Sequence, residues 1–285
     1  MNLPETTPNT DTLRQMYLDL LKRSLLNLIY FDNELRLIYL QQVIKNKQPI
    51  DPGILRDIRY RTQNYADLLS LRTAGRNFSG QIPQFSHSLI GLPRMENIQH
   101  CAEIIFKEKI PGDFMETGVW QGGATIFMRA LLKVYGEDID RCVWAADSFE
   151  GLPKPQVPQD ETYDLSASKF PFLAIGLEAV RDNFRTYNLL DDCVKFLKGW
   201  FEETLPNAPI KRLALLRLDG DLYKSTLDAL NPLYDKVSPG GFIIIDDYYA
   251  FEPCKQAVDE FRASRNIIEP MTEIDWTGVF WRKSY

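Results

Sequence analysis

The chain has 285 residues, 45% of them hydrophobic and 25% charged, with a formal net charge of −6 at pH 7. This is the composition of an ordinary globular protein, and it excludes collagen-like, disulfide-scaffold and largely disordered chains. The acidic balance argues against a nucleic-acid partner. No apolar run reaches the roughly 18 residues that a membrane span needs, so no membrane association is expected. Residues 1–12 lack the basic start and apolar stretch of a signal peptide, which predicts a cytoplasmic protein.

Cysteine and histidine restrict the kinds of site that the chain can build. The four cysteines are widely separated, match no zinc or redox pattern, and are expected to be reduced thiols. They are Cys101, Cys142, Cys193 and Cys254. His87 and His100 are the only histidines, which excludes a three-histidine metal site. Any metal site must therefore depend on carboxylates.

The first 75 residues are predicted to be helical. Apolar residues recur at helical spacing over residues 13–28, after a candidate cap at Asp11, and again over 34–45 and 54–71. Residues 72–88 contain glycine, proline and polar residues and predict an ordered loop or a lid. We interpret residues 1–75 as a helical N-terminal extension for lid or oligomer contacts, and 76–285 as the main domain.

From about residue 93 onward, short apolar runs alternate with helical patterns. This alternation is typical of an α/β protein with a mostly parallel sheet covered on both faces. Strands are expected at residues 114–116, 142–146, 194–197, 213–218 and 242–245. Helices are expected at 98–105, 124–134 (capped by Gly136), 172–187, 227–237 (capped by Ser225 or Thr226) and 254–261. Residues 238–241, Ser-Pro-Gly-Gly, are expected to end the fourth of these helices.

The end of the chain departs from that pattern. Residues 267–274 and 279–281 are separated by only a few residues, too few for a parallel crossover, so these strands should pair antiparallel. A Rossmann-like parallel sheet with one antiparallel terminal strand is the arrangement expected of class I methyltransferases.

A glycine-rich turn follows the first predicted strand. Glu116-Thr117-Gly118 leads to Gly122, but the G-x-G-x-x-G dinucleotide fingerprint is absent. The turn therefore suits S-adenosylmethionine, which has no phosphate, although a turn needed only for tight helix packing explains it equally well. Asp147, at the end of the second strand, has the position of a ribose-binding carboxylate. Asp192 and Trp200 flank the third strand and could hold an adenine ring, or be a surface aspartate and a core tryptophan.

Carboxylates follow two strands that a single βαβ unit should bring together. Asp219 ends the strand at 213–218, and Asp246 and Asp247 end the strand at 242–245. Three carboxylates in one place repel each other unless a cation joins them. Oxygen ligands favour Mg²⁺, Mn²⁺ or Ca²⁺. The alternative is that one or two of these aspartates cap the helices that follow.

Four segments together resemble the macrocin O-methyltransferase family. They are residues 112–124 (GDFMETGVWQGGA), 146–153 (ADSFEGLP), 218–223 (LDGDLY) and 245–248 (IDDY), and the resemblance covers about residues 86–285. It implies dependence on S-adenosyl-L-methionine and Mg²⁺, methylation of a sugar hydroxyl on a secondary metabolite, and a homodimer or higher homo-oligomer. The residues that it places at the cofactor are Glu116, Thr117, Gly118, Gly122, Asp147, Ser148, Asp192, Trp200 and Asp219. It places the metal at Asp219, Asp246 and Asp247.

The resemblance also suggests Asp221 as the catalytic proton acceptor. Asp221 lies two residues beyond Asp219, and metal ligands are themselves poor bases because a cation depresses their pKa. The rival bases are His87 and His100, and the plain alternative is a charge at a helix N-terminus. Tyr248, Tyr249, Trp276 and Trp281 could form an aromatic platform for the acceptor or could belong to the core.

The sequence thus predicts an S-adenosylmethionine-dependent O-methyltransferase that acts on a small hydroxylated acceptor. Two other functions stay open. One is a nicotinamide-dependent oxidoreductase on a similar sheet, which the broken glycine fingerprint disfavours. The other is a non-catalytic cofactor-binding protein, which the grouped aspartates disfavour, because a site without chemistry has no need to hold like charges together.

Overall fold

The structure is a computed structural model that describes residues 9–78 and 83–284. The chain divides into two compact units, Met1–Leu92 and Pro93–Tyr285. Each unit is described by itself below. The boundary predicted between residues 75 and 76 lies within the first unit.

The N-terminal unit is helical, as the spacing of its apolar residues predicts. Its described helices are α1 (Thr10–Leu25), α2 (Phe31–Lys45), α3 (Pro52–Arg56), α4 (Ile58–Arg61) and α5 (Tyr65–Thr73). Asn9, and not the predicted Asp11, caps α1, since its side chain accepts a hydrogen bond from the Thr12 amide at 2.8 Å. Asp11 lies inside the first turn and pairs with Arg14. An acidic residue there still interacts favourably with the helix dipole.

The core of this unit is small and partly aromatic. Phe31 and Leu35 of α2 pack with Ile58 and Phe78, and the ring of Phe31 meets those of Phe78 and Tyr65 edge-on. Part of the predicted loop at 72–88, residues 79–82, lies outside the described residues. The described core shows that the short helices α3 to α5 are held by packing, because helices this short are not stable alone.

The C-terminal unit is built on one sheet. In the described chain it has seven strands, in the order β3-β2-β1-β4-β5-β7-β6. The strands are β1 (Asp113–Thr117), β2 (Val143–Asp147), β3 (Val194–Lys198), β4 (Leu213–Leu218), β5 (Val237–Ile245), β6 (Thr272–Glu273) and β7 (Val279–Arg282). β1 to β5 pair in parallel, whereas β7 is antiparallel to both β5 and β6. The predicted parallel sheet with an antiparallel end is confirmed.

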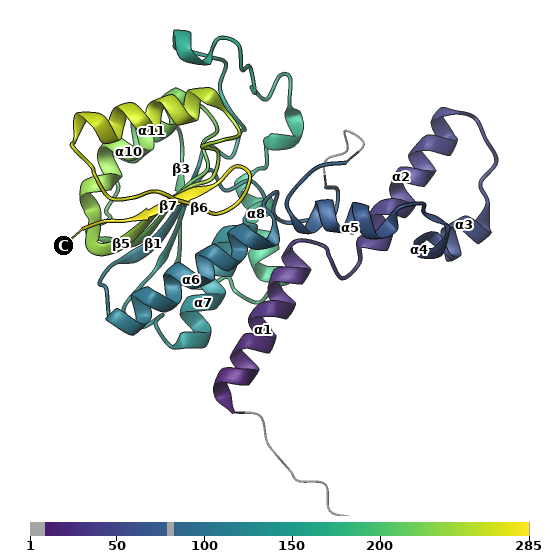
Figure 1. Ribbon diagram of the computed structural model, residues 1–285, viewed down its shortest axis with the longest axis horizontal. Helices are drawn as coiled ribbons and strands as arrows, with labels where there is room; N and C mark the ends of the chain where they lie inside the picture. The colour runs from purple at the N-terminus through teal and green to yellow at the C-terminus, as the bar shows by residue number, and fades with distance from the viewer. Residues whose placement is uncertain (1–8, 79–82, 285) are drawn as a thin grey trace, which may run out of the picture. The chain divides into compact units, whose positions relative to one another are not determined.

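Helices cover both faces of this sheet, with α6 and α7 on one side and α10 and α11 on the other (Figure 1). They are α6 (Leu92–Glu108), α7 (Gly123–Tyr135), α8 (Leu177–Thr186), α9 (Phe201–Thr204), α10 (Tyr223–Leu233) and α11 (Glu252–Ser264). Alternate strand residues serve the two faces: Met115 and Ile243 pack in one cluster with Leu230 of α10, whereas Phe114 stacks on Phe106 of α6. Continuous apolar strands are the result, as expected for a sheet buried on both sides.

Four boundaries differ from the sequence prediction. The helix predicted at 172–187 begins only at Leu177, after a 3₁₀ turn at Pro171–Leu173. Residues 238–241 lie inside β5, where a register shift against β4 accommodates the Pro-Gly-Gly segment. The strand predicted at 267–274 is reduced to Thr272–Glu273. α10 begins at Tyr223, so neither Ser225 nor Thr226 is its N-cap residue, but the Ser225 hydroxyl accepts from the amide of Leu222, the N-cap residue, at 3.3 Å. The cap predicted at Gly136 is confirmed, with a left-handed φ of 71°.

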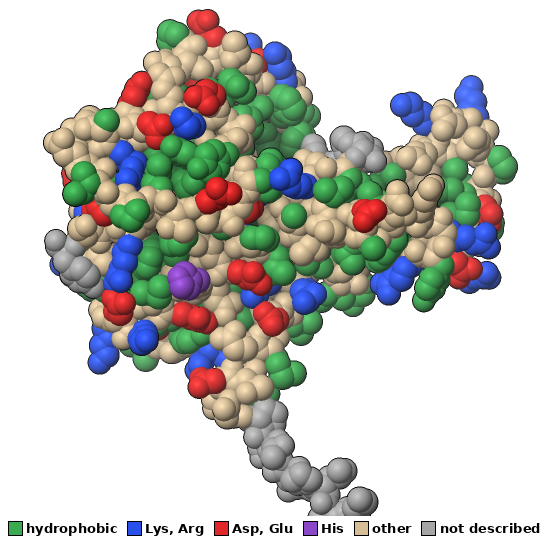
Figure 2. All heavy atoms as spheres, in the orientation of Figure 1, with side chains coloured by type: hydrophobic (Ala, Val, Ile, Leu, Met, Phe, Trp, Pro, Cys, Tyr) green, Lys and Arg blue, Asp and Glu red, His purple; other side chains and the backbone are tan. Residues whose placement is uncertain are grey.

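The described helices include none that is both long and apolar enough to cross a membrane. On the face of the C-terminal unit shown in Figure 2, acidic and basic side chains are interspersed with apolar ones. That face therefore carries no extended patch of a single charge.

Candidate active site

The candidate site lies at the carboxyl ends of β1, β2, β4 and β5. The strand order reverses between β1 and β4: the chain moves from β1 outward to β2 and β3, then returns to β4 on the other side of β1. In open α/β sheets, ligands bind where the order reverses, at the carboxyl ends of the strands. The topology thus brings the glycine turn and the Asp219 segment side by side.

The glycine turn packs directly against the end of β4. The Asp219 amide donates to the Thr117 carbonyl at 2.8 Å, and a Cβ on Gly118 would lie 1.7 Å from the Asp219 carbonyl oxygen. Gly118 also has a φ of 82°, which L side chains rarely adopt. Glycine is therefore required by packing here. This packing is against the backbone that follows β4, not the tight helix packing expected from the sequence, and it is compatible with a ligand-binding role.

Glu116 is buried behind this turn. One of its carboxylate oxygens accepts from the Arg217 guanidinium and the other from the hydroxyl of Thr125, in the first turn of α7. Burial raises the pKa of Glu116 to about 7, even though the charge of Arg217 acts to lower it. With both oxygens engaged inside the protein, Glu116 fastens β1 to α7 and so fixes the turn between them.

Asp147 ends β2 beside the turn. Its carboxylate accepts from the Val119 amide at 2.6 Å and from the Phe149 amide at 2.7 Å, and burial raises its pKa despite these bonds. Ser148 holds the next turn through the Gly151 carbonyl at 2.7 Å. Each Asp147 oxygen has two lone pairs, so both can still accept a hydroxyl.

The two candidate residues that flank β3 lie at opposite edges of the sheet. Trp200 follows β3, and the Gly199 amide before it donates to the Asp147 carbonyl at 2.9 Å, so Trp200 belongs to the site edge. Asp192 precedes β3, at the amino end of the strand. The structure therefore does not bring Asp192 to the other candidates, because the two ends of a strand face opposite edges.

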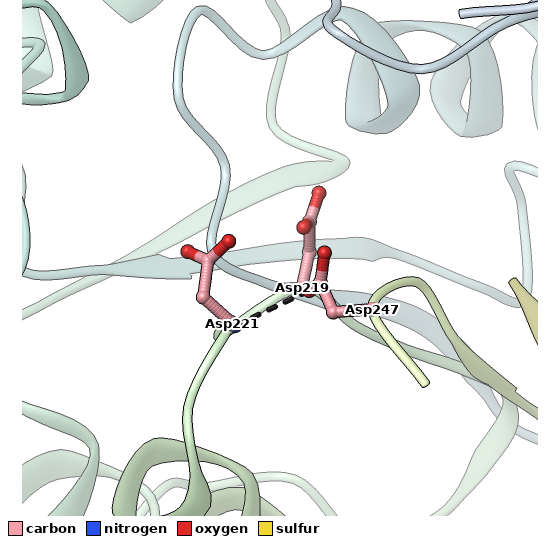
Figure 3. A group of neighbouring side chains, drawn as sticks. All are labelled: Asp219, Asp221 and Asp247. Carbon is pink, nitrogen blue, oxygen red and sulfur yellow. Dashed lines mark hydrogen bonds between the residues drawn. The ribbon is translucent and has the colours of Figure 1, made fainter. Parts of the chain in front are cut away.

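Three carboxylates gather at the ends of β4 and β5. Asp219, Asp221 and Asp247 offer oxygens that all lie within 4.8 Å of one another, and the Asp221 amide donates to Asp247 at 3.2 Å (Figure 3). Burial and the charges of the neighbouring aspartates raise the pKa of Asp221 and of Asp247 well above the ordinary range. The pKa of Asp219 is also raised, chiefly by burial. Such a group is chemically suited to a hard divalent cation.

Asp246 points into a different set of contacts. Its two oxygens accept from Arg94 of α6 and from Arg217 of β4. Arg94 also donates from Nε to Asp275 at 3.0 Å, in the turn between β6 and β7. Asp246 is therefore next to the aspartate cluster in sequence but is held by arginines in the structure.

The two arginines are site residues that the sequence reasoning missed. Arg217 is almost fully buried, at 1% exposure, and Arg94 is 5% exposed. Arg217 had a detectable signal: it is a lone charged residue inside the apolar run 213–218, and a buried charge must be paired. Arg94 had no such signal, because it lies in an amphipathic helix among polar residues.

A third missed residue is Asp160, which caps α10 from 63 residues away. Its carboxylate accepts from the Tyr223 amide at 2.9 Å and the Lys224 amide at 3.2 Å, and it is 2% exposed. Sequence analysis looks for caps immediately before a helix and cannot find one this distant. Since Asp221 lies two residues before this helix, Asp160 fixes the end of the loop that carries it.

The connection between β2 and α8, which contains Asp160, contacts two further site loops. The ring of Tyr163 meets Phe251 edge-on, at a centroid distance of 5.9 Å, next to α11. Trp120, in the glycine turn, donates from Nε1 to the Phe172 carbonyl at 2.9 Å. The loops that follow β1, β4 and β5 are therefore all fastened to this one connection.

The remaining candidate bases and aromatic residues differ in where they lie and in how far they are exposed. His100 is exposed on α6, whereas His87 lies in the N-terminal unit, where burial lowers its pKa. Trp281 is 1% exposed and belongs to the core, so it is not part of an aromatic platform for the acceptor. Tyr249 and Trp276 keep 52% and 40% exposure, and the Tyr249 amide donates to Thr277, the neighbour of Trp276.

Comparison with known proteins places this site in a family. A family model described as macrocin O-methyltransferase matches residues 14–283. The chain belongs to the macrocin O-methyltransferase family. It is 45% identical over 276 residues to a Streptomyces olivaceus protein named 8-demethyl-8-(2,3-dimethoxy-alpha-L-rhamnosyl)-tetracenomycin-C 4'-O-methyltransferase, covering 96% of this chain and 94% of that one. It is 41% identical over 275 residues to mycinamicin III 3''-O-methyltransferase of Micromonospora griseorubida, covering 95% and 97%.

A solved structure supports the same assignment. The O-methyltransferase NovP superposes with a TM-score of 0.78 at 41% identity, covering 95% of this chain and 100% of that chain. A calicheamicin methyltransferase superposes with a TM-score of 0.52 at 17% identity, covering 87% and 91%, which shows the shared fold alone. This protein is thus an O-methyltransferase with a class I methyltransferase fold, and the oxidoreductase interpretation is set aside.

Proposed function

We propose that this O-methyltransferase transfers a methyl group from S-adenosyl-L-methionine to a hydroxyl of a sugar-containing secondary metabolite, with Mg²⁺ as the metal cofactor. The observation that carries the proposal is the group formed by Asp219, Asp221 and Asp247 beside the Gly118 turn. Relatives whose names specify methylation of a rhamnosyl-bearing tetracenomycin and of mycinamicin III support a glycosylated acceptor.

The residues present fit a divalent cation. Asp219 and Asp247 offer clustered oxygens, and burial together with the neighbouring aspartates raises the pKa of both carboxyls, a cost that a bound cation would relieve. Asp246, the third proposed ligand, has both oxygens bound by arginines, yet each oxygen retains a lone pair. A cation bound there would supply Lewis-acid polarisation of the acceptor hydroxyl.

Asp221 is the proposed proton acceptor. Its side chain lies in the cluster, next to the proposed ligands, and a carboxylate with a raised pKa is a stronger base than an ordinary one. A left-handed φ of 61° at Asp221 holds the loop in a conformation that aspartate tolerates better than most residues. When the acceptor oxygen takes the methyl group, its proton passes to the Asp221 carboxylate.

The donor is proposed to bind along the ends of β1, β2 and β3. Gly118, Gly122 and Thr117 form the turn, Asp147 accepts from the ribose hydroxyls, and Trp200 lies at the next strand end. Ser148 positions the loop after Asp147, and Glu116 supports the turn from behind. The chain's contribution to the rate is alignment of two bound reactants, which makes the transfer effectively unimolecular.

A turnover assay with labelled methyl donor tests the proposal, using a panel of glycosylated and aglycone acceptors. We expect methylation of the glycosylated acceptors, loss of activity on chelation and recovery with Mg²⁺. S-adenosylhomocysteine should raise the thermal stability by mass action, whereas NAD should not. Full activity in excess chelator, or in an Asp246→Asn/Asp247→Asn double variant, would refute the metal.

We also propose a homodimer or higher homo-oligomer in the cytoplasm. Leu13, Met16 and Leu20 of α1 are exposed at helical spacing, a stripe suited to contact another copy. Light scattering checks the oligomeric state, and a Leu13→Ser/Leu20→Ser variant is expected to shift it toward monomer.

A further inference from the structure

Arg217 connects three carboxylates from three neighbouring strands. Its guanidinium donates to Glu116 of β1, to Asp219 at the end of β4 at 2.8 Å, and to Asp246 at the end of β5. Glu116 and Arg217 are register partners on adjacent strands, so the contact is fixed by the sheet itself. One buried guanidinium is thus shared by three carboxylates that belong to different parts of the site.

One side of this contact reaches the donor turn. The second oxygen of Glu116 accepts from Thr125, which lies in the first turn of α7, immediately after the glycine turn. The path therefore runs from Arg217 through Glu116 to the helix whose start defines the turn. A change in the strength of the Arg217–Glu116 ion pair therefore acts on the backbone of the turn where the donor is proposed to bind.

The other side reaches the proposed cation site. Asp219 belongs to the carboxylate cluster, and its backbone touches Gly118 and Thr117 of the turn. Six carboxylates here face two arginines. The carboxylates are Glu116, Asp219, Asp221, Asp246, Asp247 and Asp275, and the arginines are Arg94 and Arg217. The carboxylates therefore outnumber the arginines around the same guanidinium that also binds Glu116 behind the glycine turn.

We propose that Arg217 is a positioning residue that couples the two sites, so that the donor product S-adenosylhomocysteine and Mg²⁺ bind with positive cooperativity. The inference rests on the proposed function. A cation that takes charge from Asp219 and Asp246 weakens their hold on the guanidinium, which then binds Glu116 more firmly and orders the turn. The coupling is reciprocal, so each ligand tightens the other by the same factor.

Isothermal titration calorimetry on the full chain tests the coupling without any turnover. S-adenosylhomocysteine is titrated into chelator-treated protein with and without saturating Mg²⁺, and its Kd should fall about fivefold or more when Mg²⁺ is present. In Arg217→Lys both ligands should still bind, with the factor reduced below about twofold. Equal Kd values in the wild-type protein, with both ligands bound, would overturn the coupling. Failure of either ligand to bind would instead overturn the proposed function.

Two further variants separate coupling from general damage to the fold. Arg141→Lys is the matched control: Arg141 is also buried, but it donates to the Ile110 and Gly112 carbonyls at the amino edge of the sheet, and its variant should keep the full factor. Thr125→Val leaves Arg217 in place, removes the last hydrogen bond of the path and should lower the factor, even if Arg217→Lys does not fold. An undiminished factor in Thr125→Val would contradict the path through Glu116.

Discussion

Arg72 in the N-terminal unit and Arg217 in the C-terminal unit are both buried arginines that bind a buried glutamate. Arg72 donates to Glu34 at 2.9 Å, and the remaining capacity of that carboxylate is taken by the Gln84 amide at 3.2 Å and the Asn27 side chain at 3.3 Å. The charges there balance one to one. Arg217 instead serves three carboxylates, and further aspartates lie beyond them.

Glu34 and Arg72 form a closed centre, in which the charges balance. Arg217 and its carboxylates form an open centre, in which carboxylates outnumber arginines. At Glu34 the charge of the carboxylate is balanced by Arg72, and its other contacts join separate segments of the N-terminal unit. Around Arg217 the carboxylates outnumber the arginines, and burial together with the neighbouring aspartates raises the pKa of Asp219, Asp221 and Asp247. Carboxylates grouped in this way repel one another, which is the basis of the cation site proposed above.

The largest expected effect is at the closed centre. Glu34→Ala leaves Arg72 buried without its counter-ion, and the free energy of unfolding should fall by about 3–5 kcal/mol. Denaturant unfolding followed by circular dichroism measures it. A Glu34→Leu/Arg72→Met double variant, which removes both charges, should recover most of the loss. A loss below about 1 kcal/mol in the single variant would show that the pair is not closed.

At the open centre, removal of a charge is expected to raise the stability of the protein instead of lowering it. Asp221→Asn should lower kcat by about two orders of magnitude, because the proton acceptor is removed. In chelator, the same variant should be more stable than the wild-type protein by about 1 kcal/mol or more, the value of one pKa unit of unfavourable interaction. Steady-state kinetics and thermal unfolding measure the two effects.

The pH dependence of that gain provides a sharper check. The folded-state pKa of Asp221 is raised, so the folded wild-type protein keeps a proton that the unfolded chain releases. Its stability therefore falls as the pH rises above the ordinary carboxyl range, and the gain from Asp221→Asn should be larger at about pH 8 than at about pH 5. Near-normal turnover in this variant, together with collapse in His87→Ala, would assign the base to His87.

The smallest effect concerns two helix caps, one in each unit. Asp51 caps α3 locally and is exposed, accepting from the Gly53 amide at 2.7 Å, whereas Asp160 caps α10 from a distance and is buried. Asp160→Ala should cost about 2 kcal/mol of stability and Asp51→Ala about 0.5 kcal/mol. Only the former should also lower kcat, since it frees the loop of Asp221. Asp160→Asn should restore most of both, and equal effects of the two alanine variants on kcat would contradict the link to Asp221.

The pattern of residue types is enough to predict the sheet and the proximity of its acidic strand ends. Apolar runs such as 213–218 and the alternation with helices require a parallel sheet, and consecutive parallel strands present their carboxyl ends at one edge. That rule alone places Asp219 next to Asp247, and the short turn after residue 274 makes the last strands antiparallel. These features are local or topological, so a pattern of residue types carries them.

The partners of the charged groups, in contrast, depend on contacts between segments that are distant in the chain. Arg94 reaches Asp246 across 152 residues, and Asp160 reaches the start of α10 across 63. Asp192 was expected at the site, but it lies at the amino end of its strand, at the edge opposite to Asp147. Long side chains and loops choose contacts by three-dimensional proximity, and no spacing along the chain records it. For that reason the sequence identified the carboxylates, whereas the fold showed which of them arginines hold.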